Sequence, residues 1–267
     1  DNFNLYNLLE VRYFIDLVSS PEKARVISDD SWNRAKEDLV AAFSSGTNLE
    51  VCINLLKDFE AANPGTKYKS DLEVFIRESR YEDFYSDGKG SVLVSTIHKA
   101  KGREFDNVFL MLDRSNFVSD EDLRKIYVAL TRAKNNLMIH CGGNCFGGIH
   151  AANLEREWVD KSYMQPGRIA MQLSHRDVHL DYFVQCQKEI RTLQSGGELT
   201  VDGVYCTNRA GRRVLRFSKQ FVHTMEEMEK KGYVSVGAKI RFIVYWRKEA
   251  AEREIRILLP DVYFERS

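Results

Sequence analysis

Residues 92–112 read VLVSTIHKAKGREFDNVFLML, which is two apolar runs joined by a polar loop. The runs VLVST (92–96) and NVFLML (107–112) are short and almost wholly apolar, as is typical of strands buried in a parallel sheet. Side chains suited to binding or catalysis gather after the first run: Thr96, His98, Lys101, Gly102 and Glu104. Open α/β sheets keep their sites at the carboxyl ends of strands, so this stretch predicts an α/β fold with a functional loop. An ordinary polar loop is the alternative.

The next segment returns to helical spacing. In SDEDLRKIYVALTRAKNN (119–136), apolar residues recur every three to four positions, and Ser119 is a suitable N-cap followed by acidic residues. LMIHC (137–141) is a further apolar run that predicts a buried strand. The order strand, loop, strand, helix, strand is the rhythm of a doubly wound sheet.

The loop and this helix together resemble the fifth and sixth conserved motifs of the UvrD/Rep/PcrA-like superfamily 1 DNA helicases. Those motifs usually read T-x-H-x-A-K-G-L-E-F and E-E-x-R-L-x-Y-V-A-x-T-R-A. The residues that match the first are Thr96, His98, Ala100, Lys101, Gly102, Glu104 and Phe105. The residues that match the second are Glu121, Arg124, Tyr127, Val128, Ala129, Thr131, Arg132 and Ala133. Arg103 and Lys125 replace leucines, and neither change removes a polar group from the motifs.

The resemblance implies a partial RecA-like parallel sheet of the P-loop NTPase type, which faces ATP and Mg²⁺ held mainly by another domain. Arg132 would be the arginine finger that stabilises charge on the transferred phosphoryl group. The residues implied on the nucleotide side are Lys101, Gly102, Glu104 and Arg124. Thr96 and His98 would face single-stranded DNA, so that one loop couples hydrolysis to movement along the strand.

The phosphate-binding string G-x-x-x-x-G-K-[ST] does not occur in the sequence, and neither does a strand ending in Asp-Glu. We therefore expect the chain to be the C-terminal part of a longer ATP-dependent DNA helicase, inactive alone, whose N-terminal helicase domain completes the site. The parent would translocate on single-stranded DNA and unwind duplexes in repair, recombination or replication. The alternative is a non-catalytic DNA- or protein-binding module with vestigial motifs. A helicase–nuclease subunit is disfavoured because the nuclease carboxylates are absent.

Four parts are expected along the chain. They are a helical accessory segment (1–88), the distal part of the second RecA-like domain (89–148), a linker (149–168) and a small α+β, barrel-like domain (169–267). Ser70 followed by Glu73 predicts a capping box at a helix start. Alternation in 239–246 and 252–259 predicts a hairpin.

A basic stretch, NRAGRRVLRFSKQF (208–221), lies in the last part. Its arginines are Arg209, Arg212, Arg213 and Arg216, interleaved with Phe217 and Phe221. Cations beside aromatic residues suit contact with a DNA backbone and stacking on bases. A solvated hairpin with core phenylalanines, or a protein-docking surface, would produce the same pattern.

Composition limits the remaining classes. Lys+Arg and Asp+Glu are both 39, but residues 1–90 carry a net charge of −6 and residues 149–267 carry +4, which favours an anionic partner for the later part. Five cysteines at irregular spacing argue against a disulfide framework and for a reducing compartment. No apolar run approaches the ~20 residues of a membrane helix. We therefore expect a cytoplasmic location.

No metal site is expected in this chain. Two groups of residues have the right side chains without the usual spacing: His140, Cys141, Cys145 and His150, and then His175, Asp177, His179 and Asp181. The first group lacks a common zinc spacing and places two members on a predicted strand. The second lacks the Asp…Glu-x-Lys core of the nucleases fused to some relatives of the family.

Overall fold

The computed structural model describes residues 3–19, 24–85, 92, 94–98, 100–112, 119–143, 146–150, 153–161, 163–249 and 251–267. The chain divides into two compact units. Unit 1 combines Asp1–Ser86 with Met164–Ser267, and unit 2 is Asp87–Tyr163. The four-part division expected from the sequence stays a prediction.

The first part of unit 1 is helical, as predicted. Its elements are η1 (Leu5–Asn7), α1 (Leu9–Ser19), α2 (Asp29–Ala42), α3 (Leu49–Ala62), α4 (Lys69–Glu78) and α5 (Tyr81–Phe84), with a two-stranded pair β1 (Val26–Ile27) and β2 (Lys67–Tyr68). The helices bury their apolar stripes around Trp32, whose ring packs edge-on against Phe14 with ring centroids 5.0 Å apart. Within the described ranges no helix is long and apolar enough to cross a membrane.

The predicted capping box at Ser70 is wrong. Helix α4 begins at Lys69, two residues before the start that a Ser70 N-cap would give, with Tyr68 as its N-cap and no side-chain cap. The backbone N–H of Lys69 donates to the carbonyl of Arg25 at 3.0 Å, so the β1–β2 pairing leads the chain directly into the helix and fixes where it starts. The Ser70 hydroxyl instead donates to the carboxylate of Asp71 at 3.0 Å.

The second part of unit 1 is a curled, half-barrel sheet in the order β5-β10-β9-β6-β7-β8, in which every pairing is antiparallel. Its strands are β5 (Arg168–Gln172), β6 (Glu198–Asp202), β7 (Tyr205–Thr207), β8 (Arg213–Arg216), β9 (Tyr233–Trp246) and β10 (Ile255–Arg266). Three helical elements accompany them: η2 (Leu180–Cys186), α7 (Gln187–Ile190) and α8 (Lys219–Lys230). The predicted hairpin is confirmed as β9 and β10, which are longer than expected.

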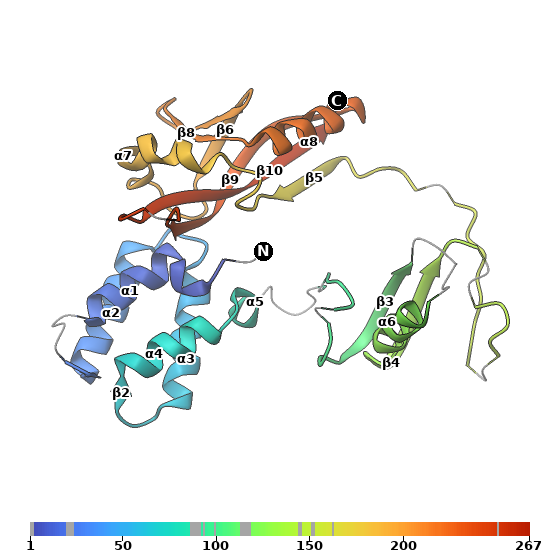
Figure 1. The fold of residues 1–267 in the computed structure, drawn as a ribbon, viewed down its shortest axis with the longest axis horizontal. Coiled ribbons are helices and arrows are strands. Elements are labelled where there is room, and N and C mark those ends of the chain that lie inside the picture. The colour runs from blue at the N-terminus through green and yellow to red at the C-terminus, as the bar shows by residue number, and fades with distance from the viewer. Residues whose placement is uncertain are drawn as a thin grey trace. The chain divides into compact units, whose positions relative to one another are not determined.

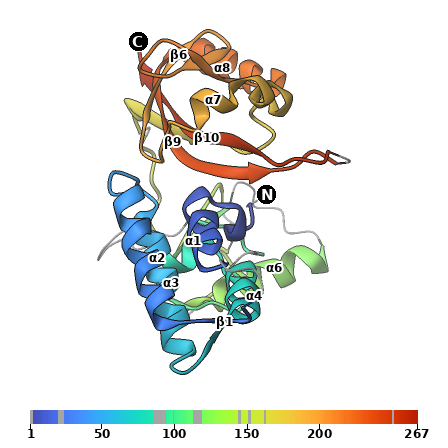
Figure 2. The same cartoon turned by 90° about the vertical axis from the view of Figure 1, so that its left-hand side faces the viewer.

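The two parts of unit 1 share one hydrophobic core. Leu8 and Val244 form an isolated antiparallel bridge, and both side chains are fully buried. In Figures 1 and 2 the long strands β9 and β10 lie between the first helices and the helices α7 and α8. Polar contacts also join the two parts along this boundary, which we call the seam: the Asn48 amide donates to the Arg241 carbonyl at 2.9 Å, and Arg12 pairs with Glu254 at 2.8 Å.

The described residues of unit 2 form two parallel strands and one helix, β3 (Phe105–Leu112), α6 (Asp120–Leu130) and β4 (Ala133–Cys141), which Figure 1 shows in green. The parallel pairing of β3 with β4, with α6 between them in sequence, confirms the strand, helix, strand part of the predicted α/β order. Leu110, Ile126 and Ala129 are buried, and α6 packs against β4. Ser119 is the N-cap, and its hydroxyl oxygen accepts from the backbone N–H of Asp122 at 3.1 Å.

Three sequence expectations fail in unit 2. The runs 107–112 and 137–141 form strands, but these are not the buried strands predicted, because Leu110 is the only buried residue described in β3 and none is buried in β4. The described residues of 92–96 form no strand, and Val92 and Val94 are 82% and 87% exposed. An apolar run becomes a buried strand only beside a partner strand, and the described parallel sheet consists of β3 and β4 alone. The helix expected over 119–136 ends at Leu130, because residues from Ala133 pair with β3 instead.

Candidate functional site

Arg132 stands at the turn from α6 to β4. The helix ends at Leu130, Thr131 is its C-cap, and Arg132 follows immediately. All three nitrogen positions of the guanidinium group donate within the chain: Nε to the Val128 carbonyl at 2.8 Å, Nη1 to the Arg103 carbonyl at 3.0 Å and Nη2 to the Thr131 hydroxyl at 3.0 Å. These hydrogen bonds hold the guanidinium group in one orientation. A guanidinium group has five N–H donors, so two remain for a carboxylate or a phosphate.

The polar loop before β3 is a run of tight turns. Backbone N–H groups of Ala100, Lys101 and Arg103 donate to carbonyls three or four residues earlier, at 3.1–3.3 Å. Gly102 has φ +85°, a left-handed conformation that glycine adopts without strain, and a Cβ there would meet nothing within 4 Å. The backbone turn itself therefore explains the glycine. The side chains of Thr96, His98, Lys101 and Glu104 are exposed.

The structure brings this loop and Arg132 together. The backbone N–H of Phe105 donates to the Arg132 carbonyl at 2.9 Å, while the Arg132 side chain donates back to the Arg103 carbonyl. One step further along, the Asn136 amide donates to the Asn107 side chain at 2.8 Å across the parallel strands. The end of the loop and the end of α6 are therefore one connected edge. Sequence reasoning missed the part of Arg103, because a backbone carbonyl leaves no mark in a motif.

Charge along α6 is arranged for its own stability. Its first turn holds Asp120, Glu121 and Asp122, which interact favourably with the helix dipole. Lys125 pairs with Glu121 at 2.7 Å, and the hydrogen bond from that pair raises the pKa of the lysine. Lys125 thus fills the motif's leucine position as a surface ion-pair partner. Arg124 is exposed on the same helix, six residues before the end that carries Arg132.

The basic residues of the 208–221 stretch belong to unit 1, whereas the loop and Arg132 belong to unit 2. Three of the four arginines have acidic partners: Arg209 with Glu198 at 3.3 Å, Arg212 with Glu189 at 3.3 Å and Arg213 with Asp202 at 3.9 Å. Arg216 is exposed. The phenylalanines behave as the core alternative expected, since Phe217 and Phe221 are buried with ring centroids 5.0 Å apart. Neither ring is available for stacking on a base.

Within the described ranges no three histidine, cysteine, aspartate or glutamate side chains gather as a metal site. Cys145 lies outside those ranges. Asp177 accepts hydrogen bonds from both the backbone N–H and the hydroxyl of Ser174 at 2.7 Å, so it closes a turn. Lys248 pairs with Asp181 at 2.8 Å.

Residues 19–142 match the family model of the UvrD-like helicase C-terminal domain. Three curated relatives have similar sequences over parts of the chain. The F-box DNA helicase protein 1 of Schizosaccharomyces pombe is 29% identical over 42% of this chain and 14% of its own length. The mitochondrial ATP-dependent DNA helicase HMI1 of Saccharomyces cerevisiae is 29% identical over 50% of this chain and 21% of its own length. The RecB subunit of the RecBCD enzyme of Chlamydia pneumoniae is 37% identical over 26% of this chain and 7% of its own length.

The chain thus spans about a fifth or less of the length of each of these relatives. No solved structure gives a significant match.

Proposed function

Because residues 19–142 are a UvrD-like C-terminal helicase region, we propose that this chain supplies one half of the ATP site of a DNA helicase and couples it to single-stranded DNA. The other half, with its phosphate-binding loop, would come from an N-terminal helicase domain of the same parent chain. The parent would translocate on single-stranded DNA and unwind duplexes in repair, recombination or replication. The four-part division of the chain belongs to this proposal.

The observation that carries the proposal is the pair of hydrogen bonds between Arg132 and the polar loop. An arginine finger acts through its orientation, and here the Nη1 bond to the Arg103 carbonyl makes that orientation depend on the loop. A loop that moves when DNA binds would therefore move the guanidinium with it. This is the physical link that a DNA-stimulated ATPase needs.

Roles for the individual residues follow from that arrangement. Arg132 would stabilise charge on the γ-phosphoryl group with its two remaining N–H donors. The exposed Lys101, Gly102 backbone, Glu104 and Arg124 would contact the nucleotide. Mg²⁺ would arrive with ATP and be held mainly by the other domain. Thr96 and His98 would contact DNA at the start of the same loop.

The DNA side of the proposal is tested with a Thr96→Ala/His98→Ala double variant of the full-length protein. Both residues are exposed, so the fold should tolerate the change. We expect basal ATP turnover to persist and its stimulation by single-stranded DNA to be lost. A Ser95→Ala/Lys134→Ala variant, also changed only at exposed positions, is the control. Unaltered stimulation in the Thr96→Ala/His98→Ala variant would show that this loop does not sense DNA.

The second candidate is a non-catalytic DNA- or protein-binding module with vestigial motifs. The pairing of three basic-stretch arginines with acids favours a surface whose charges are already balanced. Its signature would be a full-length protein without any ATPase activity. We place the protein in the cytoplasm, in keeping with the unpaired state of all four described cysteines.

A further inference from the structure

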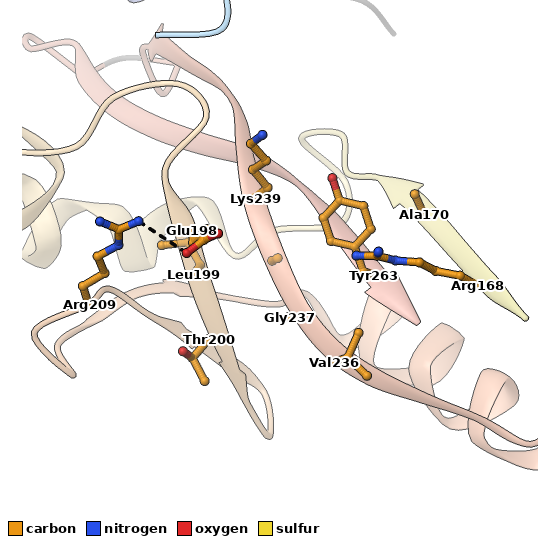
Figure 3. A pocket seen from close by; sticks show the side chains of 11 residues that line it. Arg168, Ala170, Glu198, Leu199, Thr200, Arg209, Val236, Gly237, Lys239 and Tyr263 are labelled. Atoms are coloured by element: carbon orange, nitrogen blue, oxygen red, sulfur yellow. Dashed lines mark hydrogen bonds and ion pairs between the residues drawn. The ribbon is translucent and has the colours of Figure 1, made fainter. Parts of the chain in front are cut away.

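A groove of about 790 Å³ crosses the curled sheet of unit 1, far along the sequence from the helicase motifs. Its walls come from β5, β10, β9 and β6, with one arginine from the β7–β8 connection. Figure 3 shows Arg168 and Arg209 on opposite sides, with Tyr263 and Lys239 between them. The groove is open to solvent.

The hollow arises from the strand register. Tyr263 on β10 stands directly opposite Ala170 on β5 and Gly237 on β9. Partners in register share one face of a sheet, so the tyrosine ring is flanked by two positions with almost no side chain. The Arg168 guanidinium lies over this ring at 4.7 Å from the centroid. The result is a half-buried aromatic platform with free space beside it.

The charge of the lining is positive. Three cations, Arg168, Arg209 and Lys239, face one acid, Glu198. The neighbouring Asp261 is paired with Arg241 at 3.6 Å, which neutralises it. The pairs of Arg168 with Glu265 at 3.7 Å and of Arg209 with Glu198 at 3.3 Å are exposed, and such pairs are weak enough for a phosphate to take the place of the carboxylate.

We propose that this groove binds single-stranded DNA, with phosphates on Arg168, Arg209 and Lys239 and a base stacked beside Tyr263. A groove that combines spaced cations with an aromatic ring follows a flexible polyanion and accepts any base. A duplex offers no free base to a ring at the floor of a groove, so the single strand is the occupant that uses every lining feature. The lining residues belong to unit 1 and the helicase motifs to unit 2, and the proposal does not depend on the roles proposed for the motifs.

The test measures binding of the whole chain to a fluorescein-labelled oligo-dT by anisotropy over a range of salt concentrations. An Arg168→Gln/Lys239→Gln variant should bind several-fold more weakly, and the slope of log K against log salt should shrink by about 1.4, the value for two lost phosphate contacts on a single strand. A Lys188→Gln/Arg247→Gln variant removes two exposed cations outside the lining and is the charge-matched control. The same affinity and slope in both variants would overturn the proposal.

The aromatic platform is tested separately. Tyr263→Leu should weaken binding about fivefold or more, as loss of a stacked base does elsewhere. Since Tyr263 is half-buried, Ala170→Glu provides a second variant at an exposed position, and its added carboxylate beside the ring should repel the strand. Normal binding by Ala170→Glu would overturn the proposal even if Tyr263→Leu failed to fold.

The Thr96→Ala/His98→Ala variant in the same assay keeps the two proposals apart. Loss of binding in the groove variants alone supports the groove as the binding site. The role of the polar loop is then decided by the ATPase measurement on the Thr96→Ala/His98→Ala variant. Loss in the loop variant alone overturns the groove and leaves the helicase proposal standing.

Discussion

At the scale of single residues, Glu10 is the side chain with the most unusual environment. It is fully buried at the seam of unit 1, where its Oε1 accepts a hydrogen bond from the Ser195 hydroxyl at 2.7 Å. Among the described residues nothing donates to its Oε2. Burial therefore raises the pKa of Glu10 above its usual value of 4.5.

The raised pKa has a definite consequence for stability. A carboxyl group with a higher pKa in the folded state binds protons more tightly there, so the free energy of unfolding falls as pH rises above 4.5. Glu10→Gln keeps an acceptor for Ser195 and cannot ionise. Its unfolding free energy should depend less on pH in that window, by up to about 1.4 kcal/mol per pH unit. Urea unfolding at a series of pH values measures this, with the exposed Glu50→Gln as control. Parallel profiles for Glu10→Gln and the unmodified chain would contradict the account.

The sequence placed Arg132 and the polar loop in two motifs of one family, and the roles of the motif residues stay predictions. Arg132 and the loop are indeed in contact. The carbonyl of Arg103, the seam around Glu10 and the groove around Tyr263 could not be predicted, since each depends on which strands become neighbours.

At the scale of elements, α6 leads directly to Arg132, which follows its C-cap, and is fixed at its start by Ser119. The serine oxygen accepts from the Asp122 N–H at 3.1 Å, and its hydroxyl donates to the Asp122 carboxylate at 2.8 Å. The start of α6 and the long hairpin were predictable because caps and alternation are local signals, whereas the start of α4 was not, because the β1–β2 pairing sets it. The absence of a strand in the described residues of 92–96 and the start of β4 at Ala133 could not be predicted, because both depend on whether a partner strand is present.

Ser119→Ala should therefore loosen α6 specifically. Loss of an N-cap costs about 1 kcal/mol, which corresponds to amide exchange about fivefold faster along the helix. Hydrogen exchange of peptides covering Asp120–Leu130 measures the effect, and Ser119→Asp, which retains a capping oxygen, should restore protection. Equal exchange rates in Ser119→Ala and the unmodified chain would show that tertiary packing alone fixes this helix.

At the scale of the whole molecule, segments far apart in sequence form one body in unit 1. The helices of the first 86 residues and the sheet of the last hundred share a core that sequence patterns assigned to separate parts. No local signal predicts such a union. The shared core forms because apolar side chains of the two parts, such as Leu8 and Val244, are buried only where the parts pack against each other.

Leu8→Ala should weaken both parts of unit 1 together. Removing a fully buried leucine costs about 2–5 kcal/mol. Hydrogen exchange should rise by the same factor in α3 and in β10 if the two parts unfold as one. The half-exposed Val40→Ala is the control and should leave both unchanged. Faster exchange in α3 with unaltered β10 would mean that the helices and the sheet unfold independently.

The central claim, that Arg132 belongs to an ATP site, is tested most directly by DNA-stimulated ATP turnover of the full-length protein. Removal of an arginine finger typically lowers turnover about 10³-fold or more while nucleotide binding persists, because the group acts on the transition state. We expect this loss of turnover for Arg132→Ala. The control is Lys134→Ala, which removes an exposed cation two residues later and should leave turnover close to that of the unmodified protein. Turnover by Arg132→Ala equal to that of the unmodified protein would contradict the account.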